Sequence, residues 1–152
     1  VYDIIRTIDY LEGRADVDHE RIGCMGISGG GLVCAFASVL DARIKVSVVS
    51  GYANTFKDSI MGMAHCIDNF VPGLLEVAEM PDIIGLIAPR PLLIEAGKQD
   101  PIFPVKASLK AYSQVRKIYG VLGQENRLDM DLFEGDHQIS GRKAYDWFDR
   151  WL

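Results

Sequence analysis

Short strand-like runs alternate with helix-length segments along this chain of 152 residues. The runs are rich in apolar and β-branched residues, as buried strands are, and they occupy 21–27, 44–51, 91–97 and 127–133. Segments with the length and apolar spacing of helices occupy 1–12, 29–40, 105–119 and 140–152. Strands that alternate with helices pair in parallel, because each helix returns the chain to the same end of the sheet. The sequence therefore predicts a single α/β domain with a mainly parallel sheet of about four strands and helices on both faces.

The last predicted strand differs from the others in its pattern. Leu128, Met130 and Leu132 alternate with Asp129 and Asp131, and alternation is typical of a strand with one face in water. We therefore expect the aspartates to face solvent and the strand to lie near an edge of the sheet.

Two further segments carry local expectations. The final helix is predicted to follow Ser140, a candidate N-cap residue, and its inward stripe comprises Ala144, Trp147, Phe148 and Trp151. Residues 53–90 have glycine and proline scattered among short apolar pieces, which favours short helices and loops.

Composition argues against several classes of partner. Lys and Arg number 16 against 21 Asp and Glu, and the net charge of −5 disfavours nucleic acid and anionic membranes. No apolar run approaches the roughly 20 residues of a transmembrane helix. The chain shows no signal peptide, but it does not begin with Met, so its compartment stays open. The three cysteines form no CxxC or zinc-type spacing, so we expect neither a metal site nor a disulfide framework.

A serine between glycines follows the first predicted strand. Gly26-Ile27-Ser28-Gly29-Gly30 fits the pattern GxSxG, in which a sharp turn from strand to helix exposes the serine hydroxyl. We expect glycine to be required at Gly26 and Gly30, because larger side chains would collide there. The same turn directs the backbone N–H of Gly29 toward a developing oxyanion. No GxxxxGK[ST] or GxGxxG phosphate loop is present.

Two further polar side chains follow later strands. Asp100 comes after the third predicted strand and His137 after the fourth. Because the carboxyl ends of parallel strands meet at one edge of a sheet, we expect both side chains to lie near Ser28. Asp136, the neighbour of His137, is the alternative carboxylate.

These three residue types together make an activated nucleophile. A serine hydroxyl reacts poorly until a base takes its proton, and imidazole both accepts and returns a proton near neutral pH. A carboxylate orients the imidazole and stabilises its charged form. The sequence therefore predicts Ser28 as nucleophile, His137 as base and Asp100 as acid.

Three other polar residues have different expected roles. His65 lies in the irregular segment that is expected to cover the site, and with Tyr52 it is a candidate for contact with substrate. Glu95 lies within a predicted strand and is interpreted as structural.

Three segments together resemble the C-terminal part of α/β-hydrolases of the acetyl xylan esterase and dienelactone-hydrolase-like group. VDHERIGCMGISGGG resembles the family's serine turn, IAPRPLLIEAGKQDPIFP its acid-bearing strand and loop, and FEGDHQISGRKAYDWFDRWL its histidine loop and last helix. The resemblance implies the same roles for Ser28, Asp100 and His137.

The resemblance covers only part of such a domain. A full member has about eight strands with the serine turn after the fifth, so we expect a truncated fold that holds the last four. The other half would supply a second oxyanion donor, and losing one donor costs on the order of 10²–10³ in rate. We therefore expect low activity or help from outside the chain. Strand 21–27 is apolar on both faces, and we expect its open edge to pair in a homodimer.

The function predicted from the sequence is hydrolysis of short-chain acyl esters, such as acetyl esters of carbohydrates, through an acyl-enzyme on Ser28. No metal or organic cofactor is implied. Two alternatives stay open, namely a peptidase related to prolyl oligopeptidases and a non-catalytic remnant that acts as a binding or dimerisation module.

Overall fold

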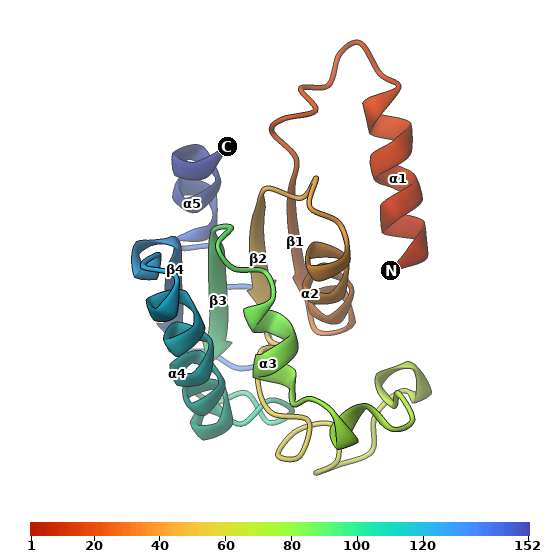
Figure 1. Ribbon diagram of the computed structural model, residues 1–152. Helices are drawn as coiled ribbons and strands as arrows, with labels where there is room; N and C mark the ends of the chain where they lie inside the picture. The colour runs from red at the N-terminus through yellow and green to blue at the C-terminus, as the bar shows by residue number, and fades with distance from the viewer.

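The computed structural model describes all of residues 1–152. The chain folds around one four-stranded sheet (Figure 1). All neighbouring strands pair in parallel, and their spatial order matches their order in the chain: β1 (Gly23–Ile27), β2 (Val46–Ser50), β3 (Leu92–Gly97) and β4 (Leu128–Phe133). The predicted α/β fold with a parallel sheet of about four strands is confirmed.

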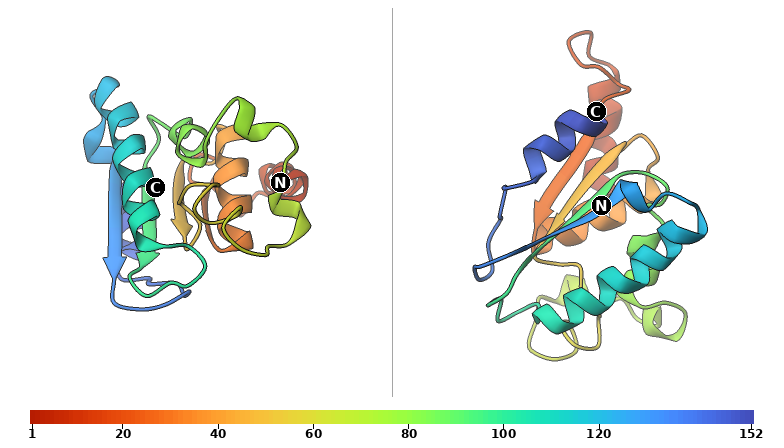
Figure 2. Two further views of the ribbon diagram at one scale, coloured as in Figure 1. Left: turned by 90° about the horizontal axis from the view of Figure 1, so that it is seen from below. Right: turned by 90° about the vertical axis from the view of Figure 1, so that its left-hand side faces the viewer.

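Helices cover both faces of the sheet, but unequally. They are α1 (Tyr2–Glu12), α2 (Gly29–Leu40), α3 (Met80–Gly85), α4 (Val105–Val121) and α5 (Ala144–Trp151), with short 3-10 turns at Ile67–Asn69, Leu74–Glu76 and Glu125–Arg127. Helices α2, α3 and α4 lie on one face, and α5 lies on the other (Figure 2). Helix α1 packs beside α2 at the β1 edge. The segment between β2 and β3 holds only short helical pieces and loops, as predicted.

The alternation of side chains along the strands divides the core into two parts. Val49, Leu92 and Ile94 point to the larger cluster under α2, α3 and α4. The residues between them point to the opposite face, where Val48 and Leu93 pack against α5. The predicted inward stripe of α5 is confirmed, since Ala144 and Trp147 are buried and Phe148 and Trp151 pack against the same cluster. A membrane span needs a longer and more continuously apolar helix than any in this structure.

The burial pattern predicted for β4 is wrong at one position. The strand does lie at an edge of the sheet, but Asp131 is buried while Leu132 is half-buried. The reason is that Ser140 and Arg142 lie against this face and bond the Asp131 carboxylate. The predicted cap is also wrong, because Ser140 bonds Asp131 and α5 begins at Ala144, after Lys143.

Strand β1 forms the other edge of the sheet, and the four residues after Gly23 are half-buried. Its outer side has no strand partner in this chain. The homodimer expected at this edge stays a prediction.

The turn between β1 and α2 forces the backbone into a rare conformation. Ser28 has φ 57° and ψ −120° and is the one residue other than glycine with a positive φ. A Cβ on Gly26 would lie 2.2 Å from the carbonyl oxygen of Gly30, and one on Gly31 would lie 2.8 Å from the Ser50 carbonyl oxygen. A Cβ on Gly30 would meet nothing within 4 Å. Glycine is therefore required at Gly26 and Gly31, and the steric reason expected for Gly30 is wrong.

This geometry separates two substitutions that the GxSxG pattern treats alike. Gly26→Ala is expected to lower the free energy of unfolding by about 1–3 kcal/mol, because backbone atoms must move to admit the methyl group. Gly30→Ala is the matched control and is expected to leave stability equal or slightly higher, because alanine favours a helix over glycine. Urea unfolding followed by circular dichroism measures both. Equal losses in the two variants would contradict this view of the turn.

A group of charges around Arg43 joins α1 to the end of α2. The guanidinium lies 2.5 Å from the Asp41 carboxylate, 2.8 Å from Asp9 and 2.6 Å from Glu12. Asp41 is buried at the C-terminal end of α2. Hydrogen bonds from the Arg43 side chain hold the pKa of Asp41 below its usual value.

The lowered pKa of Asp41 predicts a pH-dependent contribution to stability. Ionised Asp41 stabilises the folded state at pH values above its unfolded-state pKa of about 4, and that stability is lost as the pH falls through the lower folded-state pKa. Asp41→Asn is expected to lower the free energy of unfolding by about 1 kcal/mol at pH 7. Urea midpoints measured between pH 7 and pH 3 should show the difference from the parent shrinking toward acid. A difference that stays constant over this range would contradict the assignment.

Candidate active site

A histidine and a carboxylate meet beyond the carboxyl ends of β3 and β4. The Nδ1 atom of His137 lies 2.8 Å from Oδ2 of Asp100. The other oxygen, Oδ1, accepts hydrogen bonds from the backbone N–H groups of Ile102 and Phe103 at 2.8 and 3.0 Å. The Asp100 side chain is only 2% exposed. The carboxylate is therefore fixed on both sides, and its bond to Nδ1 favours the tautomer that leaves Nε2 as an acceptor.

The Nε2 atom of His137 has no partner. It is a buried nitrogen without a hydrogen bond, and a buried polar atom in that state is costly unless a ligand or reaction uses it. Asp136, the alternative acid, is exposed and its carboxylate accepts no hydrogen bond. The sequence-predicted pairing of Asp100 with His137 is therefore the one that occurs in the structure.

Ser28 lies across the end of β2 from this pair. Its N–H donates to the carbonyl oxygen of Ser50 at 3.1 Å. The next residue, Gly51, separates the two halves of the site: a Cβ there would lie 3.3 Å from the His137 ring and 3.4 Å from Ile27. No hydrogen bond joins the Ser28 hydroxyl to His137. The serine turn and the histidine loop are thus neighbours without a direct bond.

The loop that carries His137 passes very close to the end of β3. A Cβ on Gly97 would lie 2.2 Å from the carbonyl oxygen of Asp136. The backbone N–H of Gln99 donates to the Gly135 carbonyl oxygen at 2.9 Å, and the backbone N–H of Gly135 donates to Oε1 of Gln99 at 2.7 Å. These contacts hold the arm of the loop that precedes His137.

Tyr52 and His65, the two residues expected to contact substrate, both lie against Phe103, which is next to His137. The Phe103 ring stacks on His137 with centroids 5.6 Å apart, and it also contacts the rings of Tyr52 and His65 at 5.4 and 5.8 Å. His65 lines an open depression of about 470 Å³ together with Ser28 and Ile102.

Both of these residues carry unpartnered polar atoms. The Tyr52 hydroxyl and the His65 Nε2 atom are buried and make no hydrogen bond. Burial and the nearby Asp68 carboxylate raise the pKa of Tyr52, so its hydroxyl stays neutral at physiological pH. The two groups can therefore exchange hydrogen bonds with polar atoms of a ligand.

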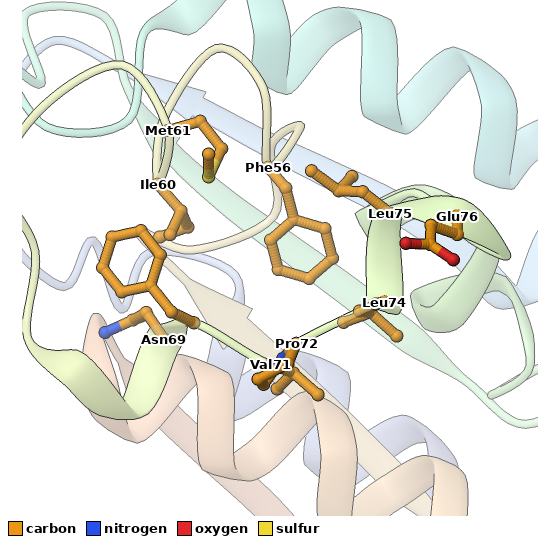
Figure 3. A pocket seen from close by; sticks show the side chains of 11 residues that line it. Phe56, Ile60, Met61, Asn69, Val71, Pro72, Leu74, Leu75 and Glu76 are labelled. Carbon is orange, nitrogen blue, oxygen red and sulfur yellow. The ribbon is translucent and has the colours of Figure 1, made fainter.

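A separate apolar cavity of about 300 Å³ lies within the segment between β2 and α3 (Figure 3). Phe56, Ile60 and Met61 line one side, and Leu74 and Leu75 line the other. Ser28 and His137 do not contribute to its walls. No group of three or more His, Cys, Asp or Glu side chains is arranged to hold a metal ion.

Sequence reasoning missed two features of this region. Gly31 is required by its contact with the end of β2, and Glu95 binds backbone groups of the histidine loop. The GxSxG pattern ends at Gly30, one residue before Gly31. The only sequence signal for Gly31 is its place as the third glycine after Ser28. No local signal linked Glu95 to residues 45 positions later.

Known proteins similar to this chain include a putative hydrolase and several esterases of solved structure. No family model matches the chain. A curated relative, the "Putative hydrolase YtaP" of Bacillus subtilis, is 31% identical over 128 residues, which are 81% of this chain and 42% of that protein. The chain therefore spans less than half the length of this relative.

Solved structures match nearly the whole chain. A glucuronoyl esterase from Sporotrichum thermophile superposes with a TM-score of 0.79 at 21% identity, over 99% of this chain and 50% of that one. A "putative acetyl xylan esterase" from Bacteroides fragilis superposes with a TM-score of 0.69 at 18% identity, over 85% of this chain and 34% of that one. The chain therefore has the α/β-hydrolase fold.

Proposed function

We propose that this chain is a serine esterase, with Ser28 as nucleophile, His137 as general base and Asp100 as the carboxylate that orients the base. The observation that carries the proposal is the bond between Asp100 and His137 at 2.8 Å, which leaves a buried and unpartnered Nε2 atom. The strained backbone of Ser28 supports it further, because strain of this kind is costly and concentrates at functional sites.

The proposed reaction has two halves. The Ser28 hydroxyl attacks the ester carbonyl carbon while its proton moves to Nε2 of His137. The tetrahedral intermediate then collapses, and the leaving alcohol takes that proton, which produces an acyl-enzyme. Water attacks the acyl-enzyme with the same help from Nε2, releasing the carboxylic acid and restoring the Ser28 hydroxyl.

Each proton transfer depends on the charge and direction of the imidazole. The Asp100 carboxylate stabilises the positive ring that forms in each half of the reaction. The N–H of Gly29, at the start of α2, is the proposed donor to the oxyanion, since the first N–H groups of a helix have no partner within it. A second donor is proposed to come from outside residues 1–152.

The proposed substrates are short-chain acyl esters, with acetyl esters of carbohydrates as the natural class. The residues around Ser28 in the depression include small or flexible apolar groups at Ala64, Met63 and Ile102, which suit a short acyl group. The unpartnered Tyr52 hydroxyl and His65 Nε2 atom suit substrate hydroxyls. Neighbours with the same fold include a carbohydrate esterase of family 15 from Caldicellulosiruptor kristjansonii and the glucuronoyl esterase from Sporotrichum thermophile.

Removing the nucleophile tests the proposal directly. Ser28→Ala is expected to lower kcat/KM for p-nitrophenyl acetate by at least about 10³-fold, because no other group forms the acyl-enzyme. A fluorophosphonate probe should label the parent at Ser28 and should not label the variant. An equal rate in the variant would contradict the mechanism. An unlabelled parent would favour the non-catalytic module, and faster cleavage of a peptide than of an ester would favour the peptidase.

Asp136, which precedes His137 in the sequence, provides a matched control for a test of Asp100. Asp100→Asn is expected to lower kcat by up to about 10⁴-fold, because an amide N–H opposite Nδ1 favours the wrong imidazole tautomer. Asp136→Asn removes the same charge from an exposed side chain and is expected to leave kcat within about twofold. Steady-state kinetics with p-nitrophenyl acetate compares them. A larger loss in Asp136→Asn would transfer the role to that residue.

A further inference from the structure

Two carboxylates are buried side by side on the face of the sheet that carries α5. Glu95 of β3 pairs in register with Asp131 of β4, and each is only 1% exposed. Because the strands are parallel and in register, both side chains project to the same face. Burying two like charges as neighbours is costly unless each one is hydrogen-bonded.

Every hydrogen-bond partner of these two side chains comes from one short segment, 140–142. The Oε2 and Oε1 atoms of Glu95 accept from the backbone N–H groups of Ser140 and Gly141 at 3.2 and 2.9 Å. Asp131 accepts from the Ser140 hydroxyl at 2.5 Å and from the Arg142 guanidinium.

The charge of Asp131 is maintained by these partners. Burial alone would raise the pKa of Asp131, but the hydrogen bonds from Arg142 and Ser140 outweigh it and hold the pKa below its usual value. The side chain is therefore ionised at neutral pH, and the guanidinium offsets charge on this face.

The segment 140–142 is the arm of the loop that follows His137. The arm before His137 is held by Gly97 and Gln99, as described above. Between the two arms the imidazole has one hydrogen bond, to Asp100. The side chains of Arg142 and Lys143 also bond β4, but Glu95 is the one residue of the sheet that accepts from backbone N–H groups of this arm.

We propose that Glu95 is a positioning residue that acts through Ser140 and Gly141 to hold His137 in its reactive position. The inference rests on the proposed function of His137 as a base. Glu95, which the sequence predicts to be a structural residue of β3, is then part of the support of the site. Asp131 holds the same arm through side chains, whereas Glu95 holds its backbone.

A carboxylate is specifically suited to this task. Its two oxygens accept from two adjacent N–H groups at once. Glutamine has nearly the same shape, but its NH₂ group would face one of those N–H groups, so one bond is lost and two donors oppose each other. Glu95→Gln therefore loosens the arm with little change in volume.

The first test compares Glu95→Gln with Glu20→Gln by steady-state hydrolysis of p-nitrophenyl acetate. Glu20 is the matched control, because it is an exposed carboxylate that pairs with Lys45 and lies before β1, at the opposite end of that strand from Ser28. Glu95→Gln is expected to lower kcat by about 10–100-fold with KM within about twofold, since a small displacement of a catalytic group carries a cost of this size. Glu20→Gln should keep both constants within about twofold.

A second readout does not depend on turnover. The chain has only three histidines, so the imidazole protons are readily assigned by NMR. The Nδ1 proton of His137 should give a downfield signal in the parent that disappears in Asp100→Asn. In Glu95→Gln the signal should broaden through faster exchange with water, whereas in Glu20→Gln it should be unchanged.

These readouts separate the failure of this inference from failure of the proposed function. If the parent neither turns over ester nor reacts with a fluorophosphonate, the proposed function fails, and the NMR comparison still decides whether Glu95 orders His137. If the parent is active but Glu95→Gln keeps both kcat and the sharp His137 signal, the positioning role is overturned.

A milder variant covers the case in which Glu95→Gln does not fold. Ser140→Ala removes the hydroxyl bonded to Asp131 but keeps the backbone N–H that Glu95 binds. We expect it to fold, to lower kcat by only a few fold and to keep the His137 signal sharp. A loss of the signal in Ser140→Ala would assign the support to Asp131 and overturn the role of Glu95.

Discussion

The close approach of the histidine loop to the end of β3 is the constraint on which the rest of the site depends. Gly97 has no side chain, so the Asp136 carbonyl can approach it closely. A Cβ at Gly97 would lie only 2.2 Å from the Asp136 carbonyl oxygen. The chain then continues from Gly97 to Asp100, whose carboxylate reaches Nδ1 of His137 at 2.8 Å. One strand end therefore provides both the space for the loop and the bond that orients its imidazole.

The same strand uses its two faces for different purposes. Leu92 and Ile94 point into the larger apolar core, and β3 is an inner strand that is buried along its whole length. On the other face Leu93 packs against α5, and two residues later Glu95 binds the arm of the histidine loop. The apolar contacts stabilise the fold, and the Glu95 carboxylate fixes the course of the loop that follows His137. Because a buried carboxylate is costly without its partners, Glu95 favours the one loop conformation that satisfies it.

Much of this arrangement could be predicted because its signals are local or follow from topology. Apolar runs and helix-length segments identify the elements, and parallel pairing brings Asp100 and His137 to one edge. The burial of Asp131 could not be predicted, because alternation describes a strand without its surroundings and the compensating Arg142 lies 11 residues away. The need for Gly31 depends on Ser50, which comes close only after the sheet has formed.

The end of β2 joins the two halves of the proposed site. The Ser50 carbonyl oxygen accepts from Ser28 and lies against Gly31, while Gly51 lies against the His137 ring. The strained conformation of Ser28, which costs on the order of 1–3 kcal/mol, is therefore maintained by a strand that also limits where the imidazole can lie. Ser50 ends β2 and Gly51 follows it, so backbone atoms at this strand end lie between the nucleophile and the base.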